Sequence, residues 1–149
     1  MIPKTEIYFA SRKTSNAHVY ITKGKGKIRI NNVPLEMVNP ETAREVMLAP
    51  LEIIGDELRD KVDISVRVRG GGFMGQAYSS ATAMSRALIG WTKSKKEPKD
   101  HPFNKSTRQQ LKTKIVEYDK YLISGDARRK EPKKFGGSGA RRRKQKSYR

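Results

Sequence analysis

The sequence predicts an α+β domain followed by an extended basic C-terminal tail. Three observations lead to this prediction. The first third of the chain alternates apolar and polar side chains as short strands do, and much of the remainder up to residue 125 has helical periodicity. Residues 126–149 contain almost no side chain that a core could bury. We therefore expect one compact globular domain over residues 1–125, with a mostly antiparallel sheet and helices on one face, and a tail over residues 126–149.

The N-terminal segments are predicted strands. Residues 7–10 and 17–21 are rich in β-branched and aromatic side chains, and residues 28–30 alternate as Ile-Arg-Ile. The polar segment 11–16 and the glycine-rich basic segment 23–27 separate these strands and predict turns. This order of short strands and turns indicates an antiparallel meander.

A helix and a further strand follow. Residues 41–54 carry apolar side chains at helical spacing. Pro50 is expected to kink or split this helix, as the first residue of a second short helix, and Gly55 suits its end. Residues 62–69 form the clearest strand of the chain, because one face is entirely apolar and the other becomes basic towards the end.

The remaining elements are helical. One helix is predicted from about residue 76 to residue 91, a charged linker over residues 92–102, and a last helix over residues 106–123. Ser106 and Gln109 fit a capping box at its start. The expected buried stripes are Ala77, Ala81, Met84, Leu88 and Trp91 in the first helix, and Leu111, Ile115, Tyr118 and Leu122 in the second.

Composition excludes several classes of function. The absence of cysteine excludes disulfides, thiolate metal sites and a cysteine nucleophile. His18 and His101 are too few and too far apart in sequence to suggest a metal site, and His18 has no evident catalytic partner. We find no signal-peptide pattern and no apolar run long enough to span a membrane. We therefore expect a soluble intracellular protein that is not an enzyme, with no cofactor, no metal, no membrane partner and no homo-oligomer.

The charge of the chain indicates its partner. The formal net charge is +18, and residues 126–149 supply half of it, with eleven Lys and Arg against Asp126 and Glu131. Such a segment cannot offset the entropy of folding, and its like charges repel one another. Each phosphate that a Lys or Arg neutralises releases counterions, so nucleic acid is the expected partner.

The glycine-rich segment after the clearest strand allows two interpretations. Gly70, Gly72 and Gly75 match the spacing of a dinucleotide-binding loop, but no second parallel strand follows the helix, so that function is not expected. Exposed backbone N–H groups at a helix N-terminus, next to Arg67 and Arg69, would bind a phosphate. Alternatively, the glycines serve only close helix–sheet packing. We favour the phosphate contact.

Several segments together resemble a known family, the ninth protein of the small ribosomal subunit in its archaeal and eukaryotic branch. They are Arg12-Lys13-Thr14, residues 24–26 with 28–32, residues 68–77, and residues 128–137 and 145–149. The resemblance implies an α+β fold like the second domain of the fifth small-subunit protein, with a left-handed βαβ crossover. It also implies a cytoplasmic location in the ribosome, in the head of the small subunit and beside neighbouring ribosomal proteins.

The resemblance further implies that the body lies on ribosomal RNA and that the tail threads through RNA towards the anticodon stem-loop of peptidyl-site tRNA. The residues predicted to bind ribosomal RNA are Arg12, Lys13, Lys25, Arg67, Arg69, Gly70, Gly71, Gly72, Arg128, Arg129, Lys130, Lys133, Lys134, Arg141, Arg142, Arg143 and Lys144. The residues predicted to approach tRNA are Lys146, Ser147, Tyr148 and Arg149.

The expected function is therefore structural, the binding and ordering of ribosomal RNA, with the C-terminus helping to hold tRNA. The alternative is a free-standing basic protein that binds messenger RNA or chromatin. Co-sedimentation with small subunits after a salt wash distinguishes the two.

Overall fold

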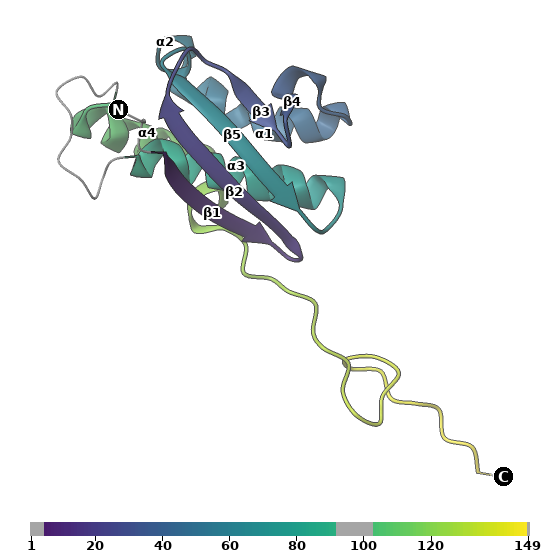
Figure 1. The fold of residues 1–149 in the computed structure, drawn as a ribbon. Coiled ribbons are helices and arrows are strands. Elements are labelled where there is room, and N and C mark those ends of the chain that lie inside the picture. Colours follow the sequence, from purple (N-terminus) through teal and green to yellow (C-terminus); the bar gives the residue numbers. More distant parts are fainter. Residues whose placement is uncertain (1–4, 92–102, 149) are drawn as a thin grey trace.

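Five strands form one mixed sheet in the order β1-β2-β5-β3-β4 (Figure 1). The computed structural model describes residues 5–91 and 103–148. All neighbouring strands pair antiparallel except β3 and β5, which are parallel. The strands are β1 (Glu6–Arg12), β2 (Ser15–Lys23), β3 (Ile28–Ile30), β4 (Val33–Pro34) and β5 (Val62–Arg69). The predicted fold class, α+β with a mostly antiparallel sheet, is confirmed.

The helices lie behind the sheet in the view of Figure 1 and leave its other face open. They are the 3-10 helix η1 (Leu35–Met37) and the α-helices α1 (Glu41–Ile54), α2 (Asp56–Arg59), α3 (Phe73–Gly90), α4 (Lys105–Tyr118) and α5 (Tyr121–Ser124). Helix α3 is central, because it packs on β1, β2 and β5 and also contacts α1, α4 and α5. Its predicted buried stripe is confirmed, and many of its side chains are small, so helix and sheet approach closely.

The hairpin between β1 and β2 is tighter than the sequence predicted. Both strands continue through the expected turn at residues 11–16, so that Arg12 pairs with Ser15 and only Lys13 and Thr14 connect them. Lys13 has a φ of 55°, in the left-handed region. The prediction failed because these strand ends are polar, and the pairing that holds them is set by backbone hydrogen bonds.

The predicted helix boundaries need three corrections. Helix α1 runs unbroken through Pro50, so it is not split there, and the short helix α2 begins only after Gly55. Helix α3 begins at Phe73, so Gly75 lies inside the helix and the loop is shorter than predicted. The single helix predicted over residues 106–123 is two helices, α4 and α5.

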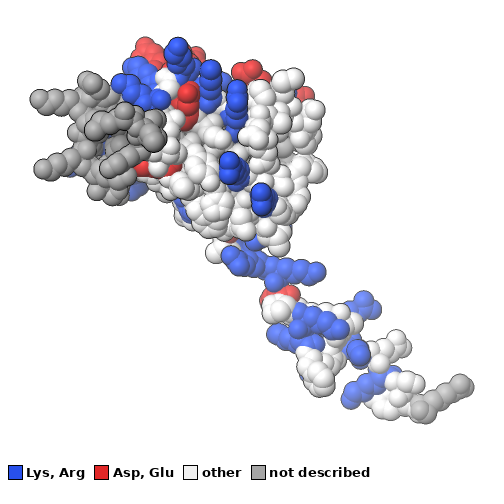
Figure 2. All heavy atoms as spheres, viewed as in Figure 1, with Lys and Arg blue, Asp and Glu red and all other residues white. Residues whose placement is uncertain are grey.

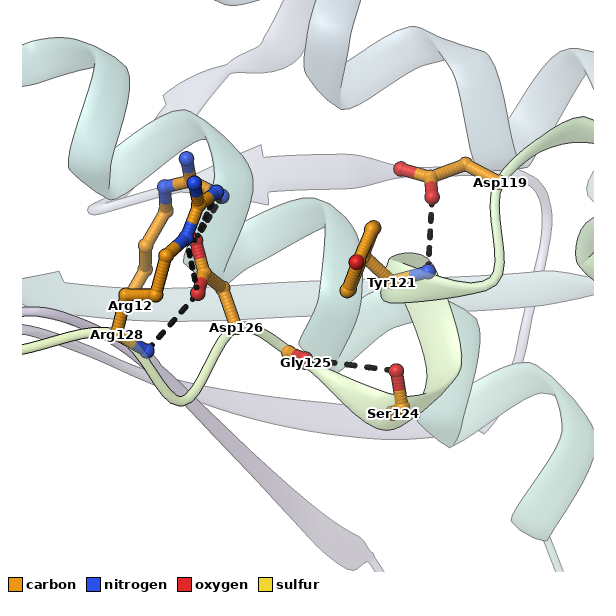
Figure 3. Close-up of polar contacts among 7 residues, drawn as sticks. All are labelled: Arg12, Asp119, Tyr121, Ser124, Gly125, Asp126 and Arg128. Atoms are coloured by element: carbon orange, nitrogen blue, oxygen red, sulfur yellow. Dashed lines mark hydrogen bonds and ion pairs between the residues drawn. The ribbon is translucent and has the colours of Figure 1, made fainter.

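The N-terminus of α4 and the interruption between α4 and α5 also differ from the prediction. Helix α4 has Asn104 as its N-cap residue and no side-chain capping bond, so the capping box is wrong. The Asp119 carboxylate accepts a 2.8 Å hydrogen bond from the Tyr121 N–H, which starts α5 (Figure 3). Tyr118, predicted to be buried, is 65% exposed. The chain direction changes between the two helices, and this leaves Tyr118 outside the stripe formed by Leu111, Ile115 and Leu122.

The core has one large member that the sequence did not indicate. Phe103 is fully buried and its ring meets that of Trp91 edge-on, with centroids 5.7 Å apart and planes at 78°. The linker predicted over residues 92–102 lies outside the described residues. Phe103 therefore fixes the chain to the core at the point where α4 is about to begin.

Beyond α5 the described residues form no helix or named strand, and the chain leads away from the sheet (Figure 1). A single antiparallel bridge joins Gly137 and Arg143. The division into a domain over residues 1–125 and an independent tail stays a prediction. No helix in the described part of the chain is long and apolar enough to cross a membrane.

Candidate nucleic-acid interface

The sheet surface opposite the helices, which we call the open sheet face, carries uncovered cations. In β5 the buried residues alternate with Arg67 and Arg69, which are exposed. Arg29 is exposed between the buried Ile28 and Ile30 on the neighbouring strand β3. Figure 2, in the same view as Figure 1, shows Lys and Arg side chains in a line across this face, with Asp and Glu side chains beside the upper part of the line only. The strand period thus places three guanidinium groups on one surface.

The basic turn before β3 borders the same face and is shaped by one acid. The Oδ1 atom of Asp63 accepts two hydrogen bonds of 2.8 Å, one from the backbone N–H of Lys25 and one from that of Lys27. Because the Asp63 carboxylate is bound by these two backbone donors, the turn is held without using the ammonium groups. The Lys25 and Lys27 side chains are exposed. Lys25 thus extends the cationic surface that the sequence predicted.

The glycine loop after β5 approaches the β1–β2 hairpin closely. Gly70 and Gly71 have φ values of 80° and 67°, which favour glycine. A Cβ on Gly70 would overlap the Thr14 carbonyl oxygen, and one on Gly71 would lie 3.1 Å from the Ser15 Cβ. Packing thus accounts for these two glycines, as the second interpretation of the sequence expected.

Gly72 is different from its two neighbours. Its φ is −96°, which any residue adopts, and a Cβ there would meet nothing within 4 Å. It is the N-cap residue of α3, so this long helix directs its N-terminal end to the surface where Arg69 ends β5. A phosphate contact at this loop therefore depends on Gly72 and its surroundings rather than on all three glycines.

The point where the C-terminal residues leave the helices is held by one carboxylate, Asp126 (Figure 3). It accepts hydrogen bonds from the backbone N–H of Arg128 at 2.9 Å and from the guanidinium of Arg128 at 3.0 and 2.9 Å. The Arg12 guanidinium lies 3.4 Å from Asp126 and stacks over the Tyr78 ring, 4.3 Å from its centroid. We call Arg12, Tyr78, Asp126 and Arg128 the tail-root cluster. It joins the end of β1 to α3 and to the C-terminal segment.

Two predicted RNA-binding residues, Arg12 and Arg128, thus have a partner in the tail-root cluster. Arg12 alternates with the buried Ala10 and so points to the helix side of the sheet, where its side chain is only 26% exposed. The Arg128 side chain is 82% exposed, so it can contact another molecule while it binds Asp126. Exposed Lys13 lies at the hairpin tip, and a hollow of about 830 Å³ is lined by the tip and by the segment after Asp126.

The tail-root cluster should depend on pH. Hydrogen bonds from the Arg128 side chain and backbone, with the nearby Arg12 charge, lower the pKa of Asp126 from 3.8 to about 2. Because the pKa in the folded protein is below the ordinary value, the contact contributes fully above about pH 4 and is lost as the pH falls towards 2. An NMR titration of Asp126 should have its midpoint near 2. A midpoint near 3.8 would mean that the cluster does not form in solution.

The C-terminal segment forms a loop of its own. The Glu131 carboxylate accepts bonds of 2.6 and 3.1 Å from the Arg141 guanidinium, and the Ser138 N–H donates to the Arg142 carbonyl at 2.9 Å. The Arg141 bonds lower the pKa of Glu131. Since an exposed ion pair contributes little to stability, the Glu131–Arg141 pair adds little to the backbone hydrogen bonds of this loop. The exposed predicted RNA contacts here are Arg129, Lys130, Lys133, Lys134, Arg141, Arg142, Arg143 and Lys144.

The last predicted residues are also exposed. Lys146, Ser147 and Tyr148 are open to solvent, and the Tyr148 side chain is 91% exposed. Arg149 lies outside the described residues. Figure 1 shows this end far from the sheet, so the structure does not bring the predicted tRNA contacts together with the open sheet face.

Sequence reasoning missed three important residues. Arg29 could have been found from its alternation with Ile28 and Ile30. Arg86 of α3 donates to the carbonyl oxygens of Phe9, Ile123 and Ser124 at 2.8–3.0 Å, and so ties the edge strand to α5. Tyr78 supports Arg12. No local pattern in the sequence could have indicated either of these long-range contacts.

Nothing in this arrangement suggests catalysis. The described residues contain no group of three or more His, Asp or Glu side chains that could hold a metal. The ring of His18 packs against Phe9, with centroids 5.1 Å apart.

Known proteins with similar sequences belong to one ribosomal family. The sequence model of the family described as ribosomal protein S9/S16 matches residues 10–149. Small ribosomal subunit protein uS9 of Methanothrix thermoacetophila is 44% identical over 138 residues, which cover 93% of this chain and 93% of that protein. The uS9 protein of Dictyostelium discoideum is 40% identical over 138 residues, which cover 93% of this chain and 89% of that protein.

Proposed function

This chain belongs to the ribosomal protein S9/S16 family and is a structural, non-enzymatic constituent of the small subunit of the cytoplasmic ribosome, and we propose that it binds ribosomal RNA through the open sheet face. The observation that carries this proposal is the set of three exposed arginines, Arg29, Arg67 and Arg69, on a surface that no helix of the described residues covers. Membership of this family removes the reason to consider a free-standing messenger RNA or chromatin protein.

The arginines are suited to phosphates for two reasons. A guanidinium group can bind two phosphate oxygens at once, and the open sheet face offers three of them: Arg67 and Arg69 lie two residues apart on β5, and Arg29 lies on the adjacent strand β3, where it pairs with Ser65. No acidic side chain among the described residues forms an ion pair with Arg29, Arg67 or Arg69. Their charge is therefore available for RNA, as is that of Lys25 in the adjoining turn.

Replacing Arg67 or Arg69 by alanine should weaken binding to a transcript of the ribosomal RNA of the subunit head. Each variant should also reduce the slope of log affinity against log salt by about one, because one phosphate contact is lost. Titrations at several salt concentrations measure this slope. Arg44→Ala is the matched control, because Arg44 forms a 2.9 Å ion pair with Glu41 in α1, away from the open sheet face. Slopes that equal that of the control would contradict the proposal.

We also propose that the C-terminal residues reach peptidyl-site tRNA while the preceding basic loop contacts ribosomal RNA. The loop of residues 131–144 carries most of the exposed cations of the C-terminal segment, and the described residues after it have no contact with the globular part. Its glycines allow the backbone to pass close to RNA strands. Neighbouring proteins of the head would then pack on the remaining surface.

Deleting residues 146–149 should leave the fold and the assembly of the subunit intact but weaken peptidyl-site tRNA retention or reduce decoding accuracy. Filter binding of tRNA to reconstituted subunits measures the first effect. The matched control is the double variant Arg142→Ala, Arg143→Ala, which also removes two positive side-chain charges but keeps the C-terminus. If the deletion and the control change tRNA affinity equally, or if the deletion changes nothing, the terminal residues do not reach the tRNA.

A further inference from the structure

The open sheet face carries rings and aliphatic groups as well as cations. Strand β1 is apolar on both faces: Tyr8 and Ala10 point to the helices, while Ile7 and Phe9 are 60% and 49% exposed on the other side. Exposed apolar groups that lie together indicate an interaction surface. Phosphate binding by arginine does not require them, so they need a second explanation.

These groups form two ordered rows across the strands. Phe9 pairs with His18, which pairs with Arg67, and in the next row Ile7 pairs with Tyr20. The Phe9 and His18 rings are 5.1 Å apart at 45°, and the Arg67 guanidinium lies 5.6 Å from the centroid of the Tyr20 ring. Rings and a cation therefore form one continuous patch, which we call the ring patch: Phe9, His18, Tyr20 and Arg67.

We propose that the ring patch stacks unpaired bases of ribosomal RNA, with Phe9 and His18 as the stacking surface and Arg67 on the adjoining phosphate. This inference rests on the proposed function, and it adds that the part of the RNA bound here is an unpaired base. Proteins bind single-stranded nucleic acid with aromatic rings beside cations, because the rings stack on the bases and the cations bind the phosphates.

Charge favours RNA over a protein partner for this patch. Among the described strand residues that point to the open sheet face, Asp63 is the only acid, and its carboxylate is bound by two backbone N–H groups. A protein packed on the patch would have to bury Arg67 without an acid of this chain beside it, and the buried centres of protein interfaces are depleted of charge. A single-stranded segment of RNA supplies both a base for the rings and a phosphate for the arginine.

Photocrosslinking in the assembled particle tests the proposal directly. The full-length chain with a photoreactive phenylalanine analogue at position 9 is incorporated into small subunits and irradiated. We expect a crosslink to an unpaired base of the ribosomal RNA. The same analogue at position 118 is the control, because Tyr118 is an exposed aromatic residue on the helical side. A crosslink from position 9 only to a protein, or none at all, would overturn the proposal.

Affinity measurements separate stacking from phosphate binding. With a single-stranded RNA oligonucleotide, Phe9→Ala should weaken binding roughly 5- to 150-fold without a change of salt slope, and Phe9→Tyr should bind as the parent does. With an abasic oligonucleotide of equal length, Phe9→Ala should have no effect. If Phe9→Ala misfolds, His18→Ala at an exposed position replaces it. Equal losses of affinity for both oligonucleotides, or no loss for either, would overturn the stacking proposal. The salt slopes of the Arg67→Ala and Arg69→Ala variants test phosphate binding separately.

Discussion

Replacing Phe103 by alanine should lower the free energy of unfolding by about 3–5 kcal/mol. The Phe103 side chain is fully buried, and its ring lies edge-on against Trp91 at the C-terminal end of α3. Alanine would remove most of this packing and leave a cavity that the surrounding helices can only partly fill. Equilibrium unfolding in a chemical denaturant, followed by circular dichroism, measures the change.

Tyr118→Ala is the matched control, since it also removes an aromatic ring but from a side chain that is 65% exposed. It should change the free energy of unfolding by less than about 0.5 kcal/mol. In conditions where both variants are folded, both should bind RNA with the parent salt slope, because neither residue lies on the open sheet face. A loss below about 1 kcal/mol for Phe103→Ala would mean that the ring is not part of the core.

Phe103 also shows why part of the fold could not be predicted. It is one apolar residue between a charged segment and the first turn of α4, so no periodicity marks it. By contrast, the strict alternation of β5 and the apolar stripe of α3 each repeat several times, and both predictions were confirmed. An apolar pattern that repeats several times can be recognised in the sequence, whereas a single contact between distant residues produces no local pattern.

The residues of the candidate site likewise differ in whether their positions could be predicted from the sequence. Alternation placed Arg67 and Arg69 on the exposed face of a predicted strand, whereas Arg12 was assigned to a turn, where alternation does not apply. Only the longer β1 of the structure shows that Arg12 alternates with the buried Ala10 and points to the helix side. The partner of Arg12 is different, because Asp126 is more than a hundred residues away in sequence and its contact depends on α5 bringing the chain back to β1.

Gly70→Ala should destabilise the protein by about 2–4 kcal/mol, which is the second large effect that we expect. The φ of 80° disfavours any residue with a Cβ by about 1–2 kcal/mol. The added Cβ would also overlap the Thr14 carbonyl oxygen, so either β5 or the β1–β2 hairpin must move. Chemical unfolding measures the loss, and the same movement should disturb Lys13 at the hairpin tip.

Gly72→Ala separates the two interpretations of the glycine loop, packing and phosphate contact. Because Gly72 has ordinary backbone angles and open space around it, alanine there should change the free energy of unfolding by less than about 1 kcal/mol, since the lower entropy of the unfolded chain offsets the poorer N-cap residue. If RNA phosphate approaches the backbone at the start of α3, the added methyl group should still weaken RNA binding. A Gly72→Ala variant with the parent stability and the parent RNA affinity would contradict the phosphate contact, and the glycines would then serve only the approach of the loop to the hairpin.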